Sequence, residues 1–158
     1  GKQWLPMGAD GKVGPEHDGG IARNNIVINA QDSSYHSNNG ANCRFYNNLT
    51  WNGDTFQRQA SYPKDPVLVN NLIGGGVKGA SENKNTLAPQ KAWFVNPDAC
   101  DFRLTEAGKA ALAGKGAPMP AEDAPTDFFG AKRDPTKPTP GPVLPDARES
   151  TQWVDRRK

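Results

Sequence analysis

Two asparagines followed by an aliphatic residue form a short motif that occurs three times in the chain. The copies are Asn24-Asn25-Ile26, Asn47-Asn48-Leu49 and Asn70-Asn71-Leu72, and each begins 23 residues after the one before it. A fixed interval between about 20 and 50 residues is typical of solenoids, in which each repeat forms one coil and stacks on the next. The spacing therefore predicts a stack of about three coils.

The residues around the asparagines repeat at the same interval. Three columns of aligned residues are Ala22, Phe45 and Leu68; Ile26, Leu49 and Leu72; and Val27, Thr50 and Ile73. A parallel stack requires such columns, because each side chain lies over its counterpart in the next coil. Segments 21–29, 45–52 and 67–74 have strand-like length and are rich in β-branched or aromatic residues. The pattern favours a parallel β-helix, and it leaves open whether the second or the third column faces inward.

Asparagine suits a bend between two strands of such a coil. Its amide donates and accepts hydrogen bonds at once, and asparagine tolerates the left-handed backbone conformation better than most residues. Stacked asparagines can therefore form a ladder. We predict that residues 16–100 form parallel strands in three coils, with Asn25, Asn48 and Asn71 stacked in register.

The carboxyl third of the chain differs from the repeats. Thr105 is a predicted N-cap of a short helix that ends near Gly114, and we expect this helix to cover the open end of the stack. Eight of the 14 prolines lie between positions 118 and 145, so residues 135–145 are predicted as an extended linker or a surface strap. The predicted divisions are a leading loop over 1–20, coils and cap over 21–117, and a Pro-rich strap and tail over 118–158.

Composition excludes several classes of protein. A mean hydropathy of −0.77 with 17 glycines describes a loop-rich chain with a thin core. No run approaches the 18 apolar residues that suggest a membrane span, and a net charge of +2 is too small to indicate nucleic-acid binding. Residues 1–20 lack the regions of a signal peptide and offer no polar cap, so we expect the chain to be the C-terminal part of a longer β-helix. Cys43 and Cys100 allow one disulfide or two buried thiols.

Several strings resemble a known superfamily. GGIARNNIVINA, FYNNLTWN and VNNLIGGGV are similar to coils of right-handed parallel β-helix proteins of the pectate-lyase-like superfamily. The segment WFVNPDACDFRLTEAGKAALAGKG with DFFGAKRDP resembles the part that closes such helices in many secreted bacterial members. The resemblance covers about residues 16–135. It implies an all-β, right-handed parallel β-helix of about three coils with a C-terminal cap, a secreted or cell-surface location, and calcium as a candidate cofactor.

Candidate chemistry gathers in the first two coils. A lyase on an acidic polysaccharide needs a base for the proton beside the uronate carboxylate, a cation for that carboxylate, and an acid for the leaving oxygen. We assign Arg44 to the carboxylate, because its planar fork matches one, and Tyr35 or His36 to proton transfer. The predicted substrate-binding residues are His17, Arg23, Trp51 and Lys64. The spacing of His17 and His36 matches no recognised metal-ligand motif, so we assign no metal ligand.

The predicted function is that of the C-terminal part of a secreted, carbohydrate-active β-helix protein, most simply a polysaccharide lyase acting on uronate-containing polymers. The alternative is a non-catalytic carbohydrate-binding or structural solenoid protein, in which Trp51, Tyr46 and Phe56 stack on sugar rings. Polysaccharide is the expected partner. A further β-helix portion or another chain is a candidate to stack on the open amino end, because an open edge strand can pair with a further strand.

Overall fold

The computed structural model describes residues 17–30, 34–38, 40–53, 56–59, 66–80, 82–149 and 151. These residues form an all-β structure in which short strands predominate and one α-helix lies near the middle of the carboxyl half. The predicted leading loop falls almost entirely outside the described residues.

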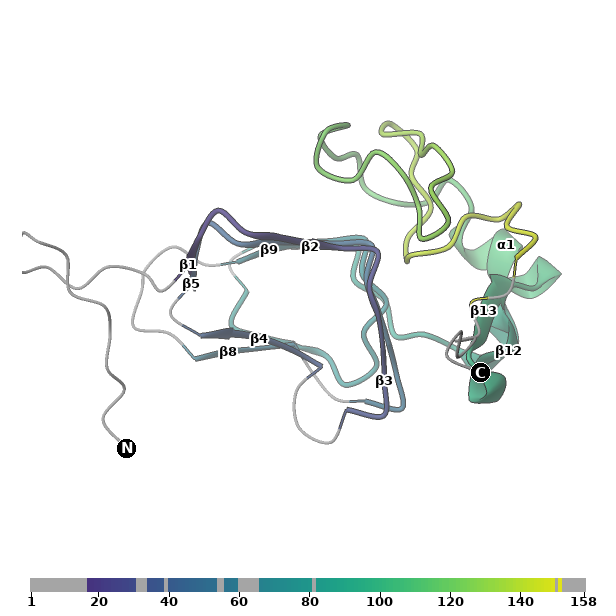
Figure 1. Cartoon of the computed structure of the whole chain (residues 1–158), viewed down its shortest axis with the longest axis horizontal. Coiled ribbons are helices and arrows are strands. Elements are labelled where there is room, and N and C mark those ends of the chain that lie inside the picture. The colour runs from purple at the N-terminus through teal and green to yellow at the C-terminus, as the bar shows by residue number, and fades with distance from the viewer. Residues whose placement is uncertain are drawn as a thin grey trace, which may run out of the picture.

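Most strands belong to parallel sheets. The four-stranded sheet contains, in spatial order, β11 (Glu82–Lys84), β9 (Val67–Val69), β6 (Arg44–Tyr46) and β2 (Ile21–Arg23). The three-stranded sheet contains β10 (Val77–Lys78), β8 (Phe56–Gln59) and β4 (Tyr35–Asn38). Two parallel pairs are β3 (Ile26–Ile28) with β7 (Leu49–Trp51), and β1 (His17–Asp18) with β5 (Gly40–Ala41). In Figure 1 the strands of each sheet nearly superpose, and three sheets lie around one common interior.

The strand register follows the 23-residue interval. Ala22 pairs with Phe45, and Phe45 pairs with Leu68. The second column is continuous as well, because Leu49 pairs with Ile26 on one side and bridges to Leu72 on the other. The predicted register is therefore confirmed for β2, β6 and β9 of the four-stranded sheet and for the β3–β7 pair, whereas β11 pairs with β9 at an interval of 15 residues.

The second asparagine of each motif forms a ladder along the stack. The Oδ1 atom of Asn48 accepts hydrogen bonds from the backbone N and the Nδ2 atom of Asn25, at 3.0 and 3.1 Å. The Oδ1 atom of Asn71 accepts the same two bonds from Asn48, both at 3.0 Å. Asn48 and Asn71 are fully buried, so each rung satisfies polar groups that would otherwise be orphaned. The predicted stacking of the three asparagines is confirmed.

The first asparagine of each motif makes the bend. Asn24, Asn47 and Asn70 have φ angles of 54°, 53° and 58°. This left-handed conformation turns the chain between two strands, and asparagine adopts it at lower cost than most other residues. The two asparagines thus have separate tasks, which explains why the motif needs both.

Both apolar columns are covered, but on opposite faces. Thr50 and Ile73 lie on the interior side, where Ile73 packs with Phe56 and Leu68. Leu49, the residue before Thr50, faces the other way and joins a cluster with residues of the C-terminal segment. Consecutive strand residues point to opposite faces. The third column therefore faces inward. The second column faces outward and is covered by the C-terminal segment.

The segment after the parallel strands is held together by its own short elements. It contains η1 (Lys91–Trp93), β12 (Phe94–Asn96), η2 (Pro97–Ala99), β13 (Asp101–Leu104) and α1 (Glu106–Leu112). Strands β12 and β13 pair in antiparallel fashion, so the prediction of parallel strands over residues 16–100 is wrong for β12. Thr105 caps α1, because its Oγ1 atom accepts a hydrogen bond from the backbone N of Gly108 at 3.1 Å. The predicted short helix and its N-cap are confirmed.

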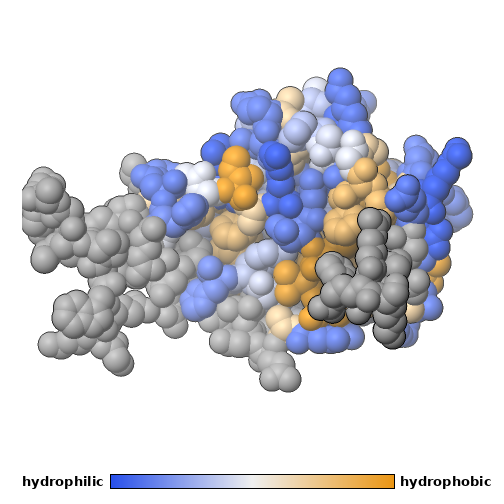
Figure 2. Space-filling model, in the orientation of Figure 1, coloured by the Kyte–Doolittle hydropathy of each residue, from blue (hydrophilic) through white to orange (hydrophobic). Residues whose placement is uncertain are grey.

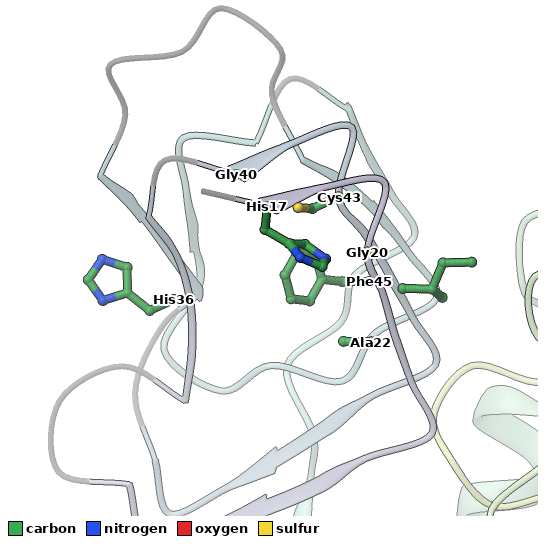
Figure 3. A pocket seen from close by; sticks show the side chains of 8 residues that line it. His17, Gly20, Ala22, His36, Gly40, Cys43 and Phe45 are labelled. Carbon is green, nitrogen blue, oxygen red and sulfur yellow. The ribbon is translucent and has the colours of Figure 1, made fainter. Parts of the chain in front are cut away.

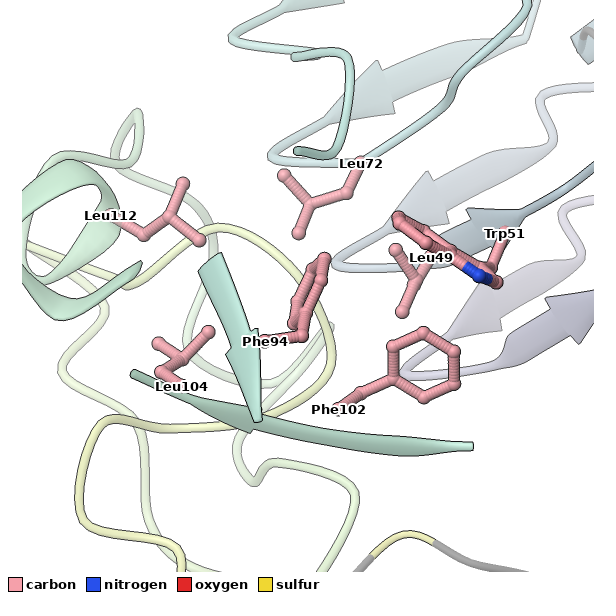
Figure 4. Close-up of a cluster of buried hydrophobic side chains, with 7 residues drawn as sticks. All are labelled: Leu49, Trp51, Leu72, Phe94, Phe102, Leu104 and Leu112. Atoms are coloured by element: carbon pink, nitrogen blue, oxygen red, sulfur yellow. The ribbon is translucent and has the colours of Figure 1, made fainter. Parts of the chain in front are cut away.

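The position of this segment differs from the prediction. Leu112 of α1 packs with Phe94, Leu104 and, across the gap, Leu72 of the parallel part. Figure 4 shows these side chains converging from both sides, and Figure 1 shows α1, β12 and β13 beside β3. The segment that contains the helix covers the outward face of the β3–β7 pair, chiefly through Phe94 of β12 and Phe102 of β13. The helix therefore lies beside the stack, and the expectation that it covers the end is wrong. The outward leucine column supplies the apolar surface that attracts it.

The Pro-rich segment is a strap that lies against the strands. The backbone N of Gly141 donates to the carbonyl oxygen of Asn70 at 2.8 Å, and residues 138–143 are buried. The buried Arg133 binds the strap from inside, donating to the carbonyl oxygens of Thr139 and Gly141 at 2.8 and 2.7 Å. Of the two alternatives for this segment, the structure supports the strap. Cys43 and Cys100 are both free thiols.

We expect Asn48→Ala to lower the free energy of unfolding by about 2–3 kcal/mol, because it leaves buried amide groups of the ladder without partners. Asn25→Ala is the matched control. Asn25 is an exposed end rung, so its loss should cost about 1 kcal/mol or less. Urea denaturation followed by circular dichroism measures both. Equal losses for the two variants would contradict a ladder whose stability depends on burial.

Candidate functional site

The outward face of the β4–β8–β10 sheet carries exposed polar side chains. His36 is exposed on β4, and Lys78 is exposed on β10. His36 pairs with Gln57 of β8, which in turn pairs with Lys78, so the three positions form one column across the sheet. Parallel strands lie about 4.8 Å apart, which places the backbones of His36 and Lys78 about 10 Å from each other. We call these three positions the outer column.

Tyr35 points away from the outer column. It precedes His36 on the same strand, and its ring packs edge-on against Phe45 with 5.9 Å between the ring centroids. Its hydroxyl donates to the carbonyl oxygen of Asn25 at 3.4 Å. Burial raises the pKa of Tyr35 far above its usual value. The phenol therefore stays protonated, and the structure does not bring Tyr35 and His36 together at one reaction centre.

Arg44 is engaged within the chain. Its Nη1 atom lies 3.0 Å from Oδ1 and 3.2 Å from Oδ2 of Asp123, whose side chain is 6% exposed. Arg23 donates from Nη1 to the carbonyl oxygen of the same aspartate at 2.6 Å. These two arginines hold the segment around Asp123 against the outward face of the four-stranded sheet. In the structure both arginines act as a clamp on this segment, whereas the sequence analysis predicted that they contact the substrate.

Tyr46 completes this clamp. It is 4% exposed, and its hydroxyl hydrogen-bonds to the Asp123 carboxylate. Burial and the negative charge of Asp123 raise the pKa of Tyr46 to about 12, because both disfavour a phenolate. Tyr46 is therefore a neutral donor at any physiological pH.

His17 lies at a cavity of about 320 Å³ on the amino side of the stack. Figure 3 shows its ring directed inward over Phe45, while the ring of His36, at the margin of the same cavity, points away. A Cβ atom on residue 20 would collide with the His17 imidazole, so Gly20 is needed for this arrangement. The two histidines share a cavity but do not converge on one point. Within the described residues, no group of three or more His, Cys, Asp or Glu side chains is placed to hold a metal ion.

Two further predicted substrate residues have different outcomes. Trp51 is 9% exposed, and its indole packs edge-on against Phe94 and Phe102 with centroid distances of 5.8 and 6.0 Å. Its role in this structure is to fill the core between the strands and the C-terminal segment. Lys64 lies outside the described residues.

Lys78 is a candidate that the sequence analysis missed. The signal was present as an interval of 21 residues, because His36, Gln57 and Lys78 follow one another at that spacing. The motif interval of 23 residues aligns β2 with β6, β6 with β9 and β3 with β7, but it does not align His36, Gln57 and Lys78. Comparing the chain with itself at a second interval would have identified the outer column.

Comparison of the chain with protein-family models, with curated proteins and with solved structures gives no significant match. Among the described residues, no helix has the length and apolar character needed to cross a bilayer.

We expect alkaline pH to destabilise the fold through its buried tyrosines. The pKa of Tyr46 is raised from about 10 in the unfolded chain to about 12 in the folded one, so its contribution is complete below pH 10 and is lost as the pH rises towards 12. The slope is at most about 1.4 kcal/mol per pH unit for each such tyrosine. Urea titrations of wild type and Tyr46→Phe between pH 8 and 12, run in parallel, measure the difference. Identical pH profiles would contradict this assignment.

We expect Arg44→Ala to lower the free energy of unfolding by about 2 kcal/mol, because the buried Asp123 carboxylate loses a charged partner. Lys132→Ala is the control, since Lys132 is an exposed cation on the C-terminal segment. Thermal and urea unfolding of the two variants give the comparison. If Arg44→Ala were as stable as the control, the ion pair would contribute nothing to folding and the clamp assignment would be wrong.

Proposed function

We propose that this chain is the C-terminal part of a right-handed parallel β-helix that acts on acidic polysaccharide outside the cell. The fold proposal is supported by three parallel sheets around one interior, by the 23-residue register of β2, β6 and β9 and of the β3–β7 pair, and by the asparagine ladder. Handedness and the superfamily come from the sequence resemblance. The polysaccharide partner also comes from that resemblance, and the surface left exposed by the C-terminal segment is where we propose that it binds.

The outer column is the observation that carries the functional proposal. The outward face of the four-stranded sheet packs against Met119 and Ala124, and that of the β3–β7 pair packs against Phe94 and Phe102. On the outward face of the β4–β8–β10 sheet the polar side chains of His36 and Lys78 are exposed. On the four-stranded sheet the exposed Lys84 is paired with Glu82, and Arg44 is paired with Asp123. An extended polymer fits along a row of strand positions, as in other solenoids.

The chemistry of the outer column suits a uronate polymer. The Lys78 ammonium pairs with a sugar carboxylate, which favours the developing negative charge when the neighbouring proton leaves. The neutral imidazole of His36 accepts that C5 proton. The electrons of the C–H bond form a C4–C5 double bond as the C4–O bond breaks, and the departing oxygen is protonated by solvent. Calcium, which the resemblance implies, has no group of three acidic or histidine ligands within the described residues, so no step depends on it.

The alternative is a non-catalytic binding or structural protein. Its sugar-stacking version loses support, because Tyr46, Trp51 and Phe56 are buried at 4%, 9% and 0% exposure. A binding module that recognises carboxylates through the outer column keeps its support. The two proposals share a surface and differ in turnover, so one set of variants tests both.

We expect Lys78→Ala to weaken binding of polygalacturonate or alginate about fivefold, as the loss of one exposed ionic contact of about 1 kcal/mol does. His36→Ala should leave binding within twofold and abolish any formation of unsaturated product, measured by its ultraviolet absorbance. Lys132→Ala is the matched control and should change neither quantity. Binding without product in wild type would favour the non-catalytic alternative.

The proposal fails under either of two results. One is an absence of binding to both polymers at low salt. The other is an equal loss of affinity for Lys78→Ala and Lys132→Ala, which would show a diffuse charge effect with no defined site.

A further inference from the structure

The two ends of the stacked sheets differ in chemistry. At the carboxyl side the last strand, β11 (Glu82–Lys84), is polar throughout, and Glu82 and Lys84 form an ion pair. Charged side chains on an edge strand prevent further strands from adding to it. At the amino side the edge strands include the polar β1 (His17–Asp18), and also β2 and β3, whose sequences are IAR and IVI. Ile21 of β2 is 40% exposed. Among the described residues, β2 and β3 are therefore mainly apolar edge strands, whereas β11 is polar at every position.

The backbone of β2 and β3 faces this edge with regular hydrogen-bonding groups. The Gly20 carbonyl and the Asn24 N–H bond to the second coil, and backbone groups alternate in direction along a strand. The groups of Ile21 and Arg23 therefore face the open side. The same argument, from the Asn25 carbonyl and the Asn29 N–H, places the groups of Ile26 and Ile28 there. Within the described part of the chain, β2 and β3 have a hydrogen-bonded neighbour on one side only.

The asparagine ladder is open at this same edge. The Oδ1 atoms of Asn48 and Asn71 each accept a backbone N–H and a side-chain N–H from the preceding rung. Asn25 is the first rung, and no described residue donates to its Oδ1 atom. The two missing donors are those that a strand with asparagine at the equivalent position supplies.

The C-terminal segment extends past the first coil on this side. A groove of about 430 Å³ lies between the first coil and the C-terminal segment. Val27 and Tyr35 line it on the side of the coil, and Cys100, Phe128 and Thr151 line it on the other side. Phe128 is 45% exposed. In the second coil the corresponding space is filled by outward side chains of β7, which pack against Phe94 and Phe102. Figure 1 views the molecule from the first coil, and Figure 2, in the same orientation, shows apolar residues over β2 and β3.

We propose that this amino-side edge is a docking surface for one more strand–bend–strand segment of the same Asn-Asn repeat, stacked in parallel. The segment's own asparagine donates its backbone N–H and its amide to Oδ1 of Asn25. Its strands pair with β2 and β3, and its outward apolar side chains enter the groove beside Phe128. The occupant is thus defined by register and by one asparagine, and the inference is independent of the polysaccharide proposal.

A peptide with the sequence of residues 44–53, RFYNNLTWNG, tests the proposal with the full chain. It contains both strands of the second coil and the bend between them. Fluorescence anisotropy of the labelled peptide measures its affinity for the chain. Only the peptide sequence is varied, so the protein is the same in every measurement and differences in its folding do not affect the comparison.

Two peptide variants form a matched pair. Asn48→Ala removes the amide that reaches Asn25, and its affinity should fall about fivefold, as for one lost hydrogen bond. Asn47→Gly keeps the bend, because glycine adopts positive φ readily, and its affinity should stay within twofold. Equal affinities for Asn48→Ala and the unchanged peptide would overturn the proposal, as would no binding at all.

Nuclear magnetic resonance of the ¹⁵N-labelled chain locates the bound peptide. The amide signals of Ile21, Arg23, Ile26 and Ile28 and the side-chain amide of Asn25 should shift, while those of β11 should not. Shifts confined to β11 would overturn the proposal. Dimerisation of the chain that the peptide does not compete with would assign the edge to a second copy, and would also overturn it.

Discussion

The paired asparagines determine how the rest of this structure is built. In each repeat the first asparagine takes a positive φ and turns the chain, and the second places its amide in a ladder that links the repeats. A buried amide without partners costs about 1–3 kcal/mol, so the ladder is stable only when successive rungs are in register. The ladder therefore fixes the register between neighbouring repeats. Apolar columns such as Ala22, Phe45 and Leu68 follow from that register.

The bend asparagines also bind the C-terminal segment, so one motif organises both parts of the chain. The Nδ2 atoms of Asn24 and Asn70 donate to the carbonyl oxygens of Thr126 and Ala117 at 2.7 and 2.9 Å. Arg133 joins this contact by donating to Oδ1 of Asn24 at 3.2 Å. The part of this segment from residue 115 onward is loop-rich, and its buried apolar side chains are fewer than those of the part before it. Its backbone carbonyls are satisfied by side chains that the bends hold in place, which explains how such a segment stays ordered.

The local features of this fold could be predicted from sequence because each has a local or periodic signal. The ladder, the strand register and the Thr105 cap are of this kind. Contacts between distant positions leave no such signal. Arg44 meets Asp123, 79 residues further along the chain, and nothing near Arg44 distinguishes a clamp from a substrate contact. Trp51 was mistaken for a surface residue for the same reason, since the aromatic partners that bury it lie in the C-terminal segment.

The candidate site depends on where the C-terminal segment is attached. The strand interval alone makes all three outward faces equivalent, and each carries a mixture of apolar and charged residues. The segment covers two of them, since Leu49 and Leu72 attract its aromatic residues and Tyr46 and Val69 attract Met119. Arg23 and Arg44 become clamps because they lie on a covered face, and His36 and Lys78 remain accessible because they do not. In this protein the same docking event that supplies the missing apolar core also selects the face that remains for a ligand.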